Sequence, residues 1–313
     1  MTGGPDGSAV GRAVDRVVAR IRPGMRAVVL AGPGVMASNA VEGLRVLAAR
    51  AGIGVLNTWG AKGLFEWQSP YHLGTAGLQE HDFELGGLGD ADLVLATGIN
   101  AYEAPPERWI HLAPSVTVPP RALGALAAAW PLPPGEPERP PLYTRLAEVV
   151  GPLYEDDRVP LAPARAVADL KAVLPEGGLV CADPGPAGFW VARTFPTSQV
   201  GSVIVPNVRE PGGAAWWGLH AARLGRPTVV VTTSPLDLES DDAIAYAAAS
   251  GIPLVVEVWG EGSLSDADVH RTLLAEAVES GRVHLVPVPV DWSDTQRLVE
   301  VAGEIVAWGG IGD

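Results

Sequence analysis

The stretch VVVTTSPLDLES, residues 229–240, predicts a buried strand that ends at a sharp turn. Valine and threonine favour extended structure, and Ser234-Pro235 ends the strand because proline cannot continue a hydrogen-bonded ladder. A small acidic cluster follows directly. In α/β proteins, ligands bind just beyond the carboxyl ends of parallel strands, so this turn is the first place where a site is expected.

The segments on both sides of this strand alternate between short apolar runs and helical patterns. In the first half, RAVVLAGPG (26–34) predicts a strand and a glycine turn, and SNAVEGLRVLAARAG (38–52) predicts a helix capped by Ser38 and ended by Gly52. The second half repeats the pattern. Continuous apolar runs are typical of parallel strands that are covered on both faces, so the sequence predicts two doubly wound α/β domains with mainly parallel sheets.

A proline-rich stretch separates the two halves. Residues 131–143, PLPPGEPERPPLY, predict a stiff and exposed connector, since proline is excluded from strand ladders and helix interiors. The sequence therefore predicts a first domain over residues 1–135, a linker with one short helical piece over residues 136–162, and a second domain over residues 163–313.

The composition is that of a soluble, folded protein. Hydrophobic residues make up 47% and charged residues 19% of the chain, and its net charge of −14 argues against nucleic acid or an anionic membrane as a partner. The N-terminus has no apolar signal core and no apolar run is long enough to span a membrane, so we expect a cytoplasmic protein. The single cysteine, Cys181, is expected to be a buried strand thiol.

The segment from residue 26 to residue 112 resembles the central domain of thiamine-diphosphate-dependent enzymes, the group of acetolactate synthase and the 2-oxoacid decarboxylases. The resemblance rests on VVLAGPGV, on GVLNTWGAKGLF and on the run SPYHLGTAGLQEHDFELGGLGDADLVLATG. In that family the central domain binds FAD, ADP or no nucleotide. The resemblance therefore implies either a nucleotide at Gly32, Gly34 and Gly98 or plain strand-to-helix turns at these glycines.

The second half is similar to the diphosphate-binding domain of the same enzymes. ADPGPAGFWVAR stands where the family has an Asp-Gly turn, GGAAWWGLHAARLGRPTVVV where it has a glycine- and alanine-rich helix, and IAYAAASGIPLVVEVW where it has the helix and strand before the metal site. The family's Gly-Asp-Gly then aligns with Thr233-Ser234-Pro235, and its Asn-Asn aligns with Gly260-Glu261, directly after PLVVEVW. The positions that the resemblance assigns to cofactor binding in this domain are Asp183, Gly185, Thr233, Ser234, Asp237, Gly260 and Glu261.

The metal-binding motif of the family is altered in this chain. An Asp carboxylate and an Asn oxygen bind Mg²⁺ in the family, and Ser234 and Glu261 stand in their places. Ser234 carries no charge, and Pro235 removes an amide donor, so the resemblance implies weak binding of thiamine diphosphate. Glu261 and Asp237 either form an altered metal site or are solvated loop carboxylates.

These departures predict a truncated relative, a pseudoenzyme, that is non-catalytic as an isolated chain. The family's catalytic glutamate belongs to a pyrimidine-binding domain that precedes the central domain, and this sequence starts near the central domain, so we assign no catalytic residue. The family also holds its cofactor bent with an apolar residue, where this chain has Arg209-Glu210, expected to be a solvated pair. We expect a binding or scaffold subunit that pairs as a homodimer or with a second chain.

Two other functions follow from the same resemblance. The chain could be the diphosphate-binding subunit of a two-chain enzyme, in which another chain supplies the pyrimidine-binding domain for decarboxylation or carboligation of a 2-oxo acid. It could also be a sensor that holds a nucleotide or acyl-CoA in the central domain. The adjacent Trp216 and Trp217 on one predicted helix indicate either a partner surface or core packing.

Overall fold

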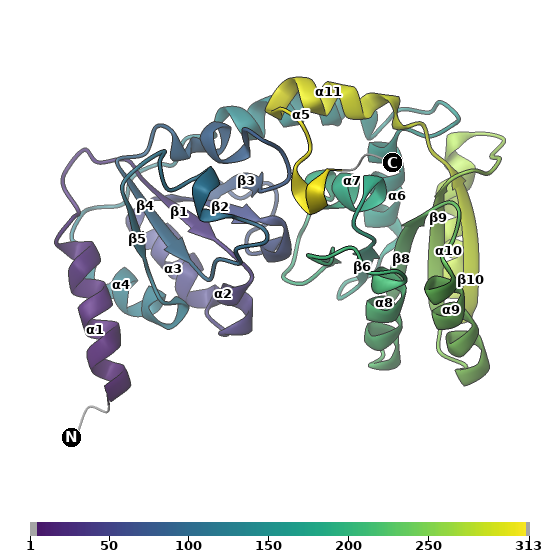
Figure 1. Cartoon of the computed structure of the whole chain (residues 1–313), viewed down its shortest axis with the longest axis horizontal. Coiled ribbons are helices and arrows are strands. Elements are labelled where there is room, and N and C mark those ends of the chain that lie inside the picture. Colours follow the sequence, from purple (N-terminus) through teal and green to yellow (C-terminus); the bar gives the residue numbers. More distant parts are fainter. Residues whose placement is uncertain (1–4, 311–313) are drawn as a thin grey trace. The chain divides into compact units, whose positions relative to one another are not determined.

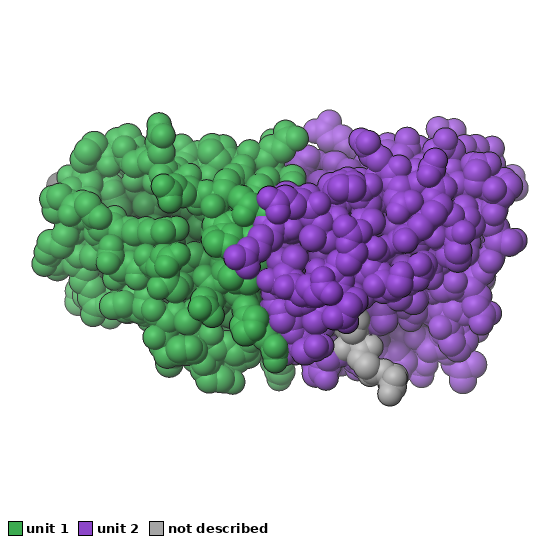
Figure 2. All heavy atoms as spheres, turned by 90° about the horizontal axis from the view of Figure 1, so that it is seen from above, with its two compact units in different colours: residues 1–144 green, residues 145–313 purple. Residues whose placement is uncertain are grey.

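The computed structural model describes residues 5–310 and contains two compact units, Met1–Thr144 and Arg145–Asp313 (Figure 2). The division lies within residues 136–162, and helix α5 (Pro141–Leu153) crosses it. Each unit contains one five-stranded sheet in which all pairings between named strands are parallel (Figure 1). The predicted fold class, two α/β domains with parallel sheets, is therefore confirmed.

The sheet of unit 1 has the strand order β3-β2-β1-β4-β5. Its strands are β1 (Ala27–Ala31), β2 (Gly54–Thr58), β3 (His72–Ala76), β4 (Leu93–Thr97) and β5 (Ser115–Thr117). Its helices are α1 (Pro5–Val18), α2 (Gly34–Ala37), α3 (Val41–Ala51) and α4 (Leu123–Ala129). Side chains of α1, α3 and α4 form one hydrophobic core with β1, β2 and β4.

One predicted helix boundary in unit 1 is correct and the other is wrong. Helix α3 ends at Gly52, whose left-handed φ of 62° suits a residue without a side chain. The predicted cap, Ser38, instead ends the short helix α2, and α3 begins after Ala40. A separate one-turn helix, α2, therefore follows the glycine turn after β1. The hydrophobic periodicity of the sequence did not distinguish it from α3.

The sheet of unit 2 has the strand order β10-β9-β8-β6-β7. Its strands are β6 (Leu179–Ala182), β7 (Val203–Ile204), β8 (Thr228–Thr233), β9 (Leu254–Gly260) and β10 (Val283–Pro289). Its helices are α6 (Pro163–Val173), α7 (Pro186–Thr194), α8 (Gly213–Arg223), α9 (Leu238–Ser250), α10 (Ala267–Glu279) and α11 (Thr295–Ala302). The strand predicted at the start of VVVTTSPLDLES is β8, and it ends at Thr233 as expected.

Strand β6 explains the single cysteine. Cys181 is fully buried among the side chains that pack under α8 and α9. Burial raises the pKa of its thiol to about 12, so the thiolate is not populated near neutral pH. The prediction of a buried strand thiol is confirmed. None of the helices within residues 5–310 combines the length and the apolar composition that a membrane-spanning helix needs.

Both strand orders reverse at one point, where the next strand in the sequence is added on the other side of the first strand of the sheet. In unit 1 this switch point lies between β1 and β4, and in unit 2 it lies between β6 and β8. The loops that leave the two strands diverge there, which opens a crevice at the carboxyl edge of a parallel sheet. Each unit therefore has one position that its topology favours for a ligand.

Candidate functional site

The switch point of unit 1 is filled by backbone. The amide of Gly32 donates to the carbonyl oxygen of Thr97 at 2.9 Å, and the amide of Gly34 donates to that of Gly98 at 2.9 Å. A Cβ atom on Gly32 would lie 2.4 Å from the carbonyl oxygen of Gly98, and a Cβ atom on Gly34 would lie 2.8 Å from the Cα atom of Gly98. This close approach accounts for the three glycines without a ligand, and a nucleotide at them stays a prediction.

The switch point of unit 2 carries a pocket, which we call the strand-end pocket. It is a cavity of about 300 Å³. Its lining comes from the two residues after β6, the last two residues of β8, the loop before α8 and the turn between β8 and α9. The lining residues are Asp183, Pro184, Arg209, Glu210, Pro211, Thr232, Thr233, Pro235 and Asp237. Three of them are carboxylates and one is a cation, so the lining is acidic.

Asp183 follows β6 directly and enters the pocket lining. Its Oδ1 atom accepts a hydrogen bond of 2.9 Å from the amide of Ala214 in the first turn of α8. Burial raises the pKa of Asp183; the bonds from the Ala214 amide and the Thr232 hydroxyl oppose that rise, and the carboxylate of Asp237 adds to it. The pKa of Asp183 therefore lies above its ordinary value.

Asp237 is the N-cap of helix α9. Its Oδ1 accepts a hydrogen bond of 2.6 Å from the amide of Ser240, and its Oδ2 accepts one of 3.1 Å from the amide of Gly212. One carboxylate thus joins the start of α9 to the turn before α8, and both of its oxygens are bonded to this chain. The cap is readable from the sequence, since an aspartate precedes a helical pattern there.

The other predicted positions lie around this pocket to different degrees. Thr233 is part of the lining, whereas Ser234 donates its amide to the carbonyl oxygen of Trp259 at 3.0 Å. Gly260 ends β9 next to Ser234, with a φ of 135° that favours glycine. Gly185 is the residue before α7, and its φ of 141° likewise favours glycine.

The metal prediction rests on two residues that the structure places differently. Glu261 is exposed, whereas Asp237 is partly buried and bonded to two amides. Within residues 5–310 no group of three or more His, Cys, Asp or Glu side chains is arranged to hold a metal ion. A site at Glu261 and Asp237 stays a prediction that would need ligands from elsewhere.

Sequence reasoning missed the role of the loop before α8. Arg209 and Glu210 are exposed, as predicted, but they also line the strand-end pocket. The Arg209 guanidinium donates to the carbonyl oxygen of Gly310, and the Trp308 indole donates to that of Pro206 at 2.8 Å. The C-terminal segment therefore holds this loop, a contact between distant residues that no local sequence signal indicates.

An exposed aromatic face lies on helices α8 and α9. Trp216 is 44% exposed, Trp217 is 53% exposed and Tyr246 is 49% exposed. The rings of Trp216 and Tyr246 lie 6.4 Å apart between centroids, so the two helices contribute to one surface. The two tryptophans are therefore not part of the core, and a partner surface at them stays a prediction.

Comparisons with known proteins agree with the predicted resemblance. Residues 14–118 match the family model "Thiamine pyrophosphate enzyme, central domain". A putative thiamin diphosphate-dependent enzyme from Mycobacterium smegmatis has a similar structure, with a TM-score of 0.66, 16% identity, and coverage of 90% of this chain and 64% of that one. Benzoylformate decarboxylase from Polynucleobacter necessarius gives a TM-score of 0.67, 13% identity, and coverage of 93% and 65%.

These matches establish the fold and the resemblance of the first unit. At 13–16% identity the two solved structures show a shared fold alone, and this chain spans 64–65% of their length. A comparison with curated proteins finds no match. The resemblance to thiamine-diphosphate enzymes is therefore confirmed by the family model over the central domain and by the fold over most of the chain.

Proposed function

We propose that this chain is a non-catalytic binding subunit built on the fold of thiamine-diphosphate enzymes. The observation that carries this proposal is the pair of carboxylates in the strand-end pocket. Asp183 and Asp237 accept the amide hydrogens of Ala214, Gly212 and Ser240, which lie at the starts of α8 and α9. A phosphate needs such amides as donors, and here they are bonded to groups that carry the same charge as a phosphate.

Thiamine diphosphate therefore fits the pocket poorly. The lining offers Arg209 as its one cation against Asp183, Glu210 and Asp237. A bound Mg²⁺ would have to offset these charges, and the described residues contain no cluster of three metal-ligating side chains. We derive no catalytic step through this cofactor.

The binding function is assigned to the aromatic face of Trp216, Trp217 and Tyr246, with a second copy of this chain as its partner. The exposed residues His220 and Arg223 lie toward the end of α8, whereas acidic residues follow Leu238 at the start of α9. Both helices run antiparallel to β8 and therefore parallel to each other. The basic end of α8 and the acidic start of α9 thus lie at opposite ends of the aromatic face. A two-fold axis across the helices brings the basic end of one copy onto the acidic end of the other.

A second candidate is the diphosphate-binding subunit of a two-chain enzyme. It is favoured by the place of the pocket, at the switch point of the sheet and beside Thr232 and Thr233. The two similar structures are described as a putative thiamin diphosphate-dependent enzyme and a benzoylformate decarboxylase. In this candidate Glu261 and Asp237 bind Mg²⁺, and another chain supplies the pyrimidine-binding domain for decarboxylation or carboligation of a 2-oxo acid.

Calorimetric titration with thiamine diphosphate and Mg²⁺ separates the two candidates. We expect no binding to the unaltered chain at about 1 mM ligand, and detectable binding to the double variant Asp183→Asn/Asp237→Asn, in which the repelling charges are gone. Glu261→Gln serves as the matched control, because it removes a carboxylate outside the pocket lining. Metal-dependent binding to the unaltered chain that is lost in Glu261→Gln would overturn the first candidate and support the second.

Light scattering after size exclusion tests the partner. We expect a dimer for the unaltered chain and a monomer for Trp216→Ser/Trp217→Ser, because the tryptophans would supply most of the apolar area at the interface. Tyr102→Ser is the control, since Tyr102 is 73% exposed on unit 1 and lies outside the aromatic face. A monomeric unaltered chain would overturn the assignment of a second copy as the partner.

A further inference from the structure

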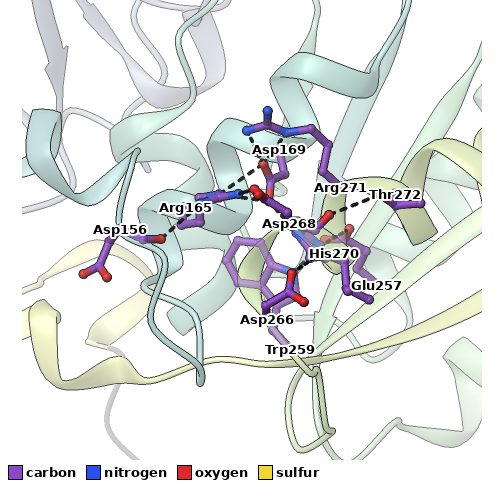
Figure 3. A network of polar contacts seen from close by, with 11 residues as sticks. Asp156, Arg165, Asp169, Glu257, Trp259, Asp266, Asp268, His270, Arg271 and Thr272 are labelled. Atoms are coloured by element: carbon purple, nitrogen blue, oxygen red, sulfur yellow. Dashed lines mark hydrogen bonds and ion pairs between the residues drawn. The ribbon is translucent and has the colours of Figure 1, made fainter.

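A charged cluster is buried in unit 2, away from the lining of the strand-end pocket (Figure 3). His270 on α10 lies at its centre, with Nδ1 2.9 Å from Oδ2 of Asp169 on α6 and Nε2 2.9 Å from Oε1 of Glu257 on β9. All three side chains are fully buried. Glu257 alternates with Val256 and Val258, which face α8 and α9, so its carboxylate points to the opposite face of the sheet.

With both carboxylates ionised, the geometry calls for a doubly protonated imidazole. An ionised carboxylate can only accept hydrogen bonds, so a ring nitrogen that faces one must carry a hydrogen, and both nitrogens of His270 face carboxylates. Burial lowers the pKa of His270, but the charge of Glu257 and the bonds to Asp169 and Glu257 outweigh burial and raise that pKa to about 9. The bonding pattern and the direction of the pKa shift therefore agree on an imidazolium at neutral pH.

Neighbouring charges balance the cluster. Asp169 also accepts from Arg271 at 2.7 Å and lies 3.3 Å from Arg165, and Arg165 in turn pairs with Asp268 at 2.7 Å. Burial raises the pKa of Asp169, but the bonds from His270 and Arg271 lower it below its ordinary value. Strand β10, which also packs against α10, contributes His284 as its titratable residue.

Glu257 connects this cluster to the edge of the strand-end pocket. Its Oε2 accepts a hydrogen bond of 2.8 Å from the indole of Trp259, which is fully buried and lies against Trp292. The carbonyl oxygen of Trp259 accepts the amide of Ser234 at 3.0 Å, and Pro235, the next residue, lines the pocket. An unbroken series of contacts thus runs from His270 through Glu257 and Trp259 to the turn after β8.

We propose that protonated His270 is a latch that holds α10 to β9 and α6 and, through Glu257 and Trp259, positions the turn at Ser234-Pro235. Loss of its proton in alkaline solution leaves a neutral ring between two buried carboxylates, of which only one can receive a hydrogen. The other carboxylate then loses its bond to His270 and keeps only its remaining contacts, which for Glu257 is the bond from the Trp259 indole, and this favours a rearrangement of Glu257 and of that indole. The strand-end pocket therefore changes shape with this proton, whichever ligand it binds.

Nuclear magnetic resonance of the labelled full chain tests the latch. Side-chain nitrogen spectra should show both nitrogens of His270 protonated at pH 7, and the backbone amides of Ser234 and Gly260 should shift with pH together with His270. Glu257→Gln keeps the size of the side chain and removes its charge, so we expect the midpoint of His270 and of both amides to fall by about one pH unit or more.

Two references separate the latch from a general loss of stability. Leu274→Val trims a buried apolar side chain on the same helix and should leave the midpoint unchanged. His72 in unit 1 is also buried, but both of its ring nitrogens lack a hydrogen-bond partner, and burial, followed by the charges of Lys62 and Arg139, lowers its pKa to about 3. A single protonated nitrogen on His270 at pH 7 would overturn the proposal. So would amides of Ser234 and Gly260 that stay constant while His270 titrates in the unaltered chain, even if Glu257→Gln does not fold.

Discussion

The switch points of the two sheets occupy equivalent places and are built in opposite ways. In unit 1 the turn after β1 packs directly on the turn after β4, with Gly34 and Gly98 in backbone contact. In unit 2 the chain after β6 and β8 presents side chains, and a cavity of about 300 Å³ remains between them. The topology alone therefore does not decide whether a crevice becomes a site.

The residues at the two turns explain the difference. Glycine lets two backbones approach until their amides and carbonyls bond each other, which leaves no room and no free donor. Aspartate at the second switch point bonds helix amides with a side chain instead, as Asp183 and Asp237 do, and so keeps the backbones apart. The closed crevice of unit 1 stabilises its sheet. The open crevice of unit 2 has room for a ligand, but the carboxylates of Asp183 and Asp237 give it a negative charge.

The largest effect expected from testing this contrast is at Gly98. Gly98→Ala would place a Cβ atom 2.5 Å from the amide nitrogen of Val35 at a φ of 61°, so both the contact and the backbone are strained. We expect the free energy of unfolding of unit 1 to fall by about 2–4 kcal/mol. Hydrogen exchange of the β1 and β4 amides, read by mass spectrometry, measures this unit separately.

Gly213→Ala is the matched substitution at the other switch point. A Cβ atom there would lie 3.8 Å from Pro206 and 4.0 Å from Oδ1 of Asp183, which are ordinary contacts. Because Gly213 is the first residue of α8, alanine should be neutral or stabilising by up to about 1 kcal/mol. Equal losses for Gly98→Ala and Gly213→Ala would contradict the contrast between a closed and an open crevice.

A smaller effect is expected at Asp237. Asp237→Ala removes the cap of α9 and the acceptor for the Gly212 amide, so we expect unit 2 to lose about 1–2 kcal/mol. Asp237→Asn retains one side-chain oxygen as an acceptor and should lose less. Urea denaturation followed by hydrogen exchange in α9 measures both variants, and an alanine variant as stable as the unaltered chain would show that the cap does not hold the pocket open.

Much of this fold was predictable because local patterns and topology agree. Short apolar runs predicted the parallel strands, and the stop at Ser234-Pro235 predicted the end of β8. The boundary at Ser38 was wrong because a one-turn helix and a longer helix share one apolar periodicity. Local patterns carry no information on whether a glycine contacts a ligand or another backbone segment. The contact of Gly32 with Gly98 is therefore seen only in the structure.

The candidate site was predictable only in its location. The resemblance placed Asp183 and Asp237 near a diphosphate, and the structure brings both into one pocket. Their bonds to Ala214 and Gly212 depend on how α8 and α9 start next to each other, which no spacing in the sequence fixes. The role of the buried His270 was not predicted, because its carboxylate partners Glu257 and Asp169 lie 13 and 101 residues away in the sequence.

The smallest expected effect is the pH dependence that Asp183 gives to unit 2. Burial raises the pKa of Asp183 above its ordinary value of 3.8, and the charge of Asp237 raises it further. Between these two pKa values the folded chain holds a proton that the unfolded chain has released, so the contribution of Asp183 to stability is full below pH 3.8 and is lost as pH rises through the folded pKa. Asp183→Asn should flatten this part of the stability profile, and Asp237→Asn should lower the pKa of Asp183 by removing a neighbouring charge. Carbon-detected titration of the Asp183 carboxyl measures both, and a pKa of Asp183 that does not move in Asp237→Asn would mean that the two carboxylates do not share one pocket.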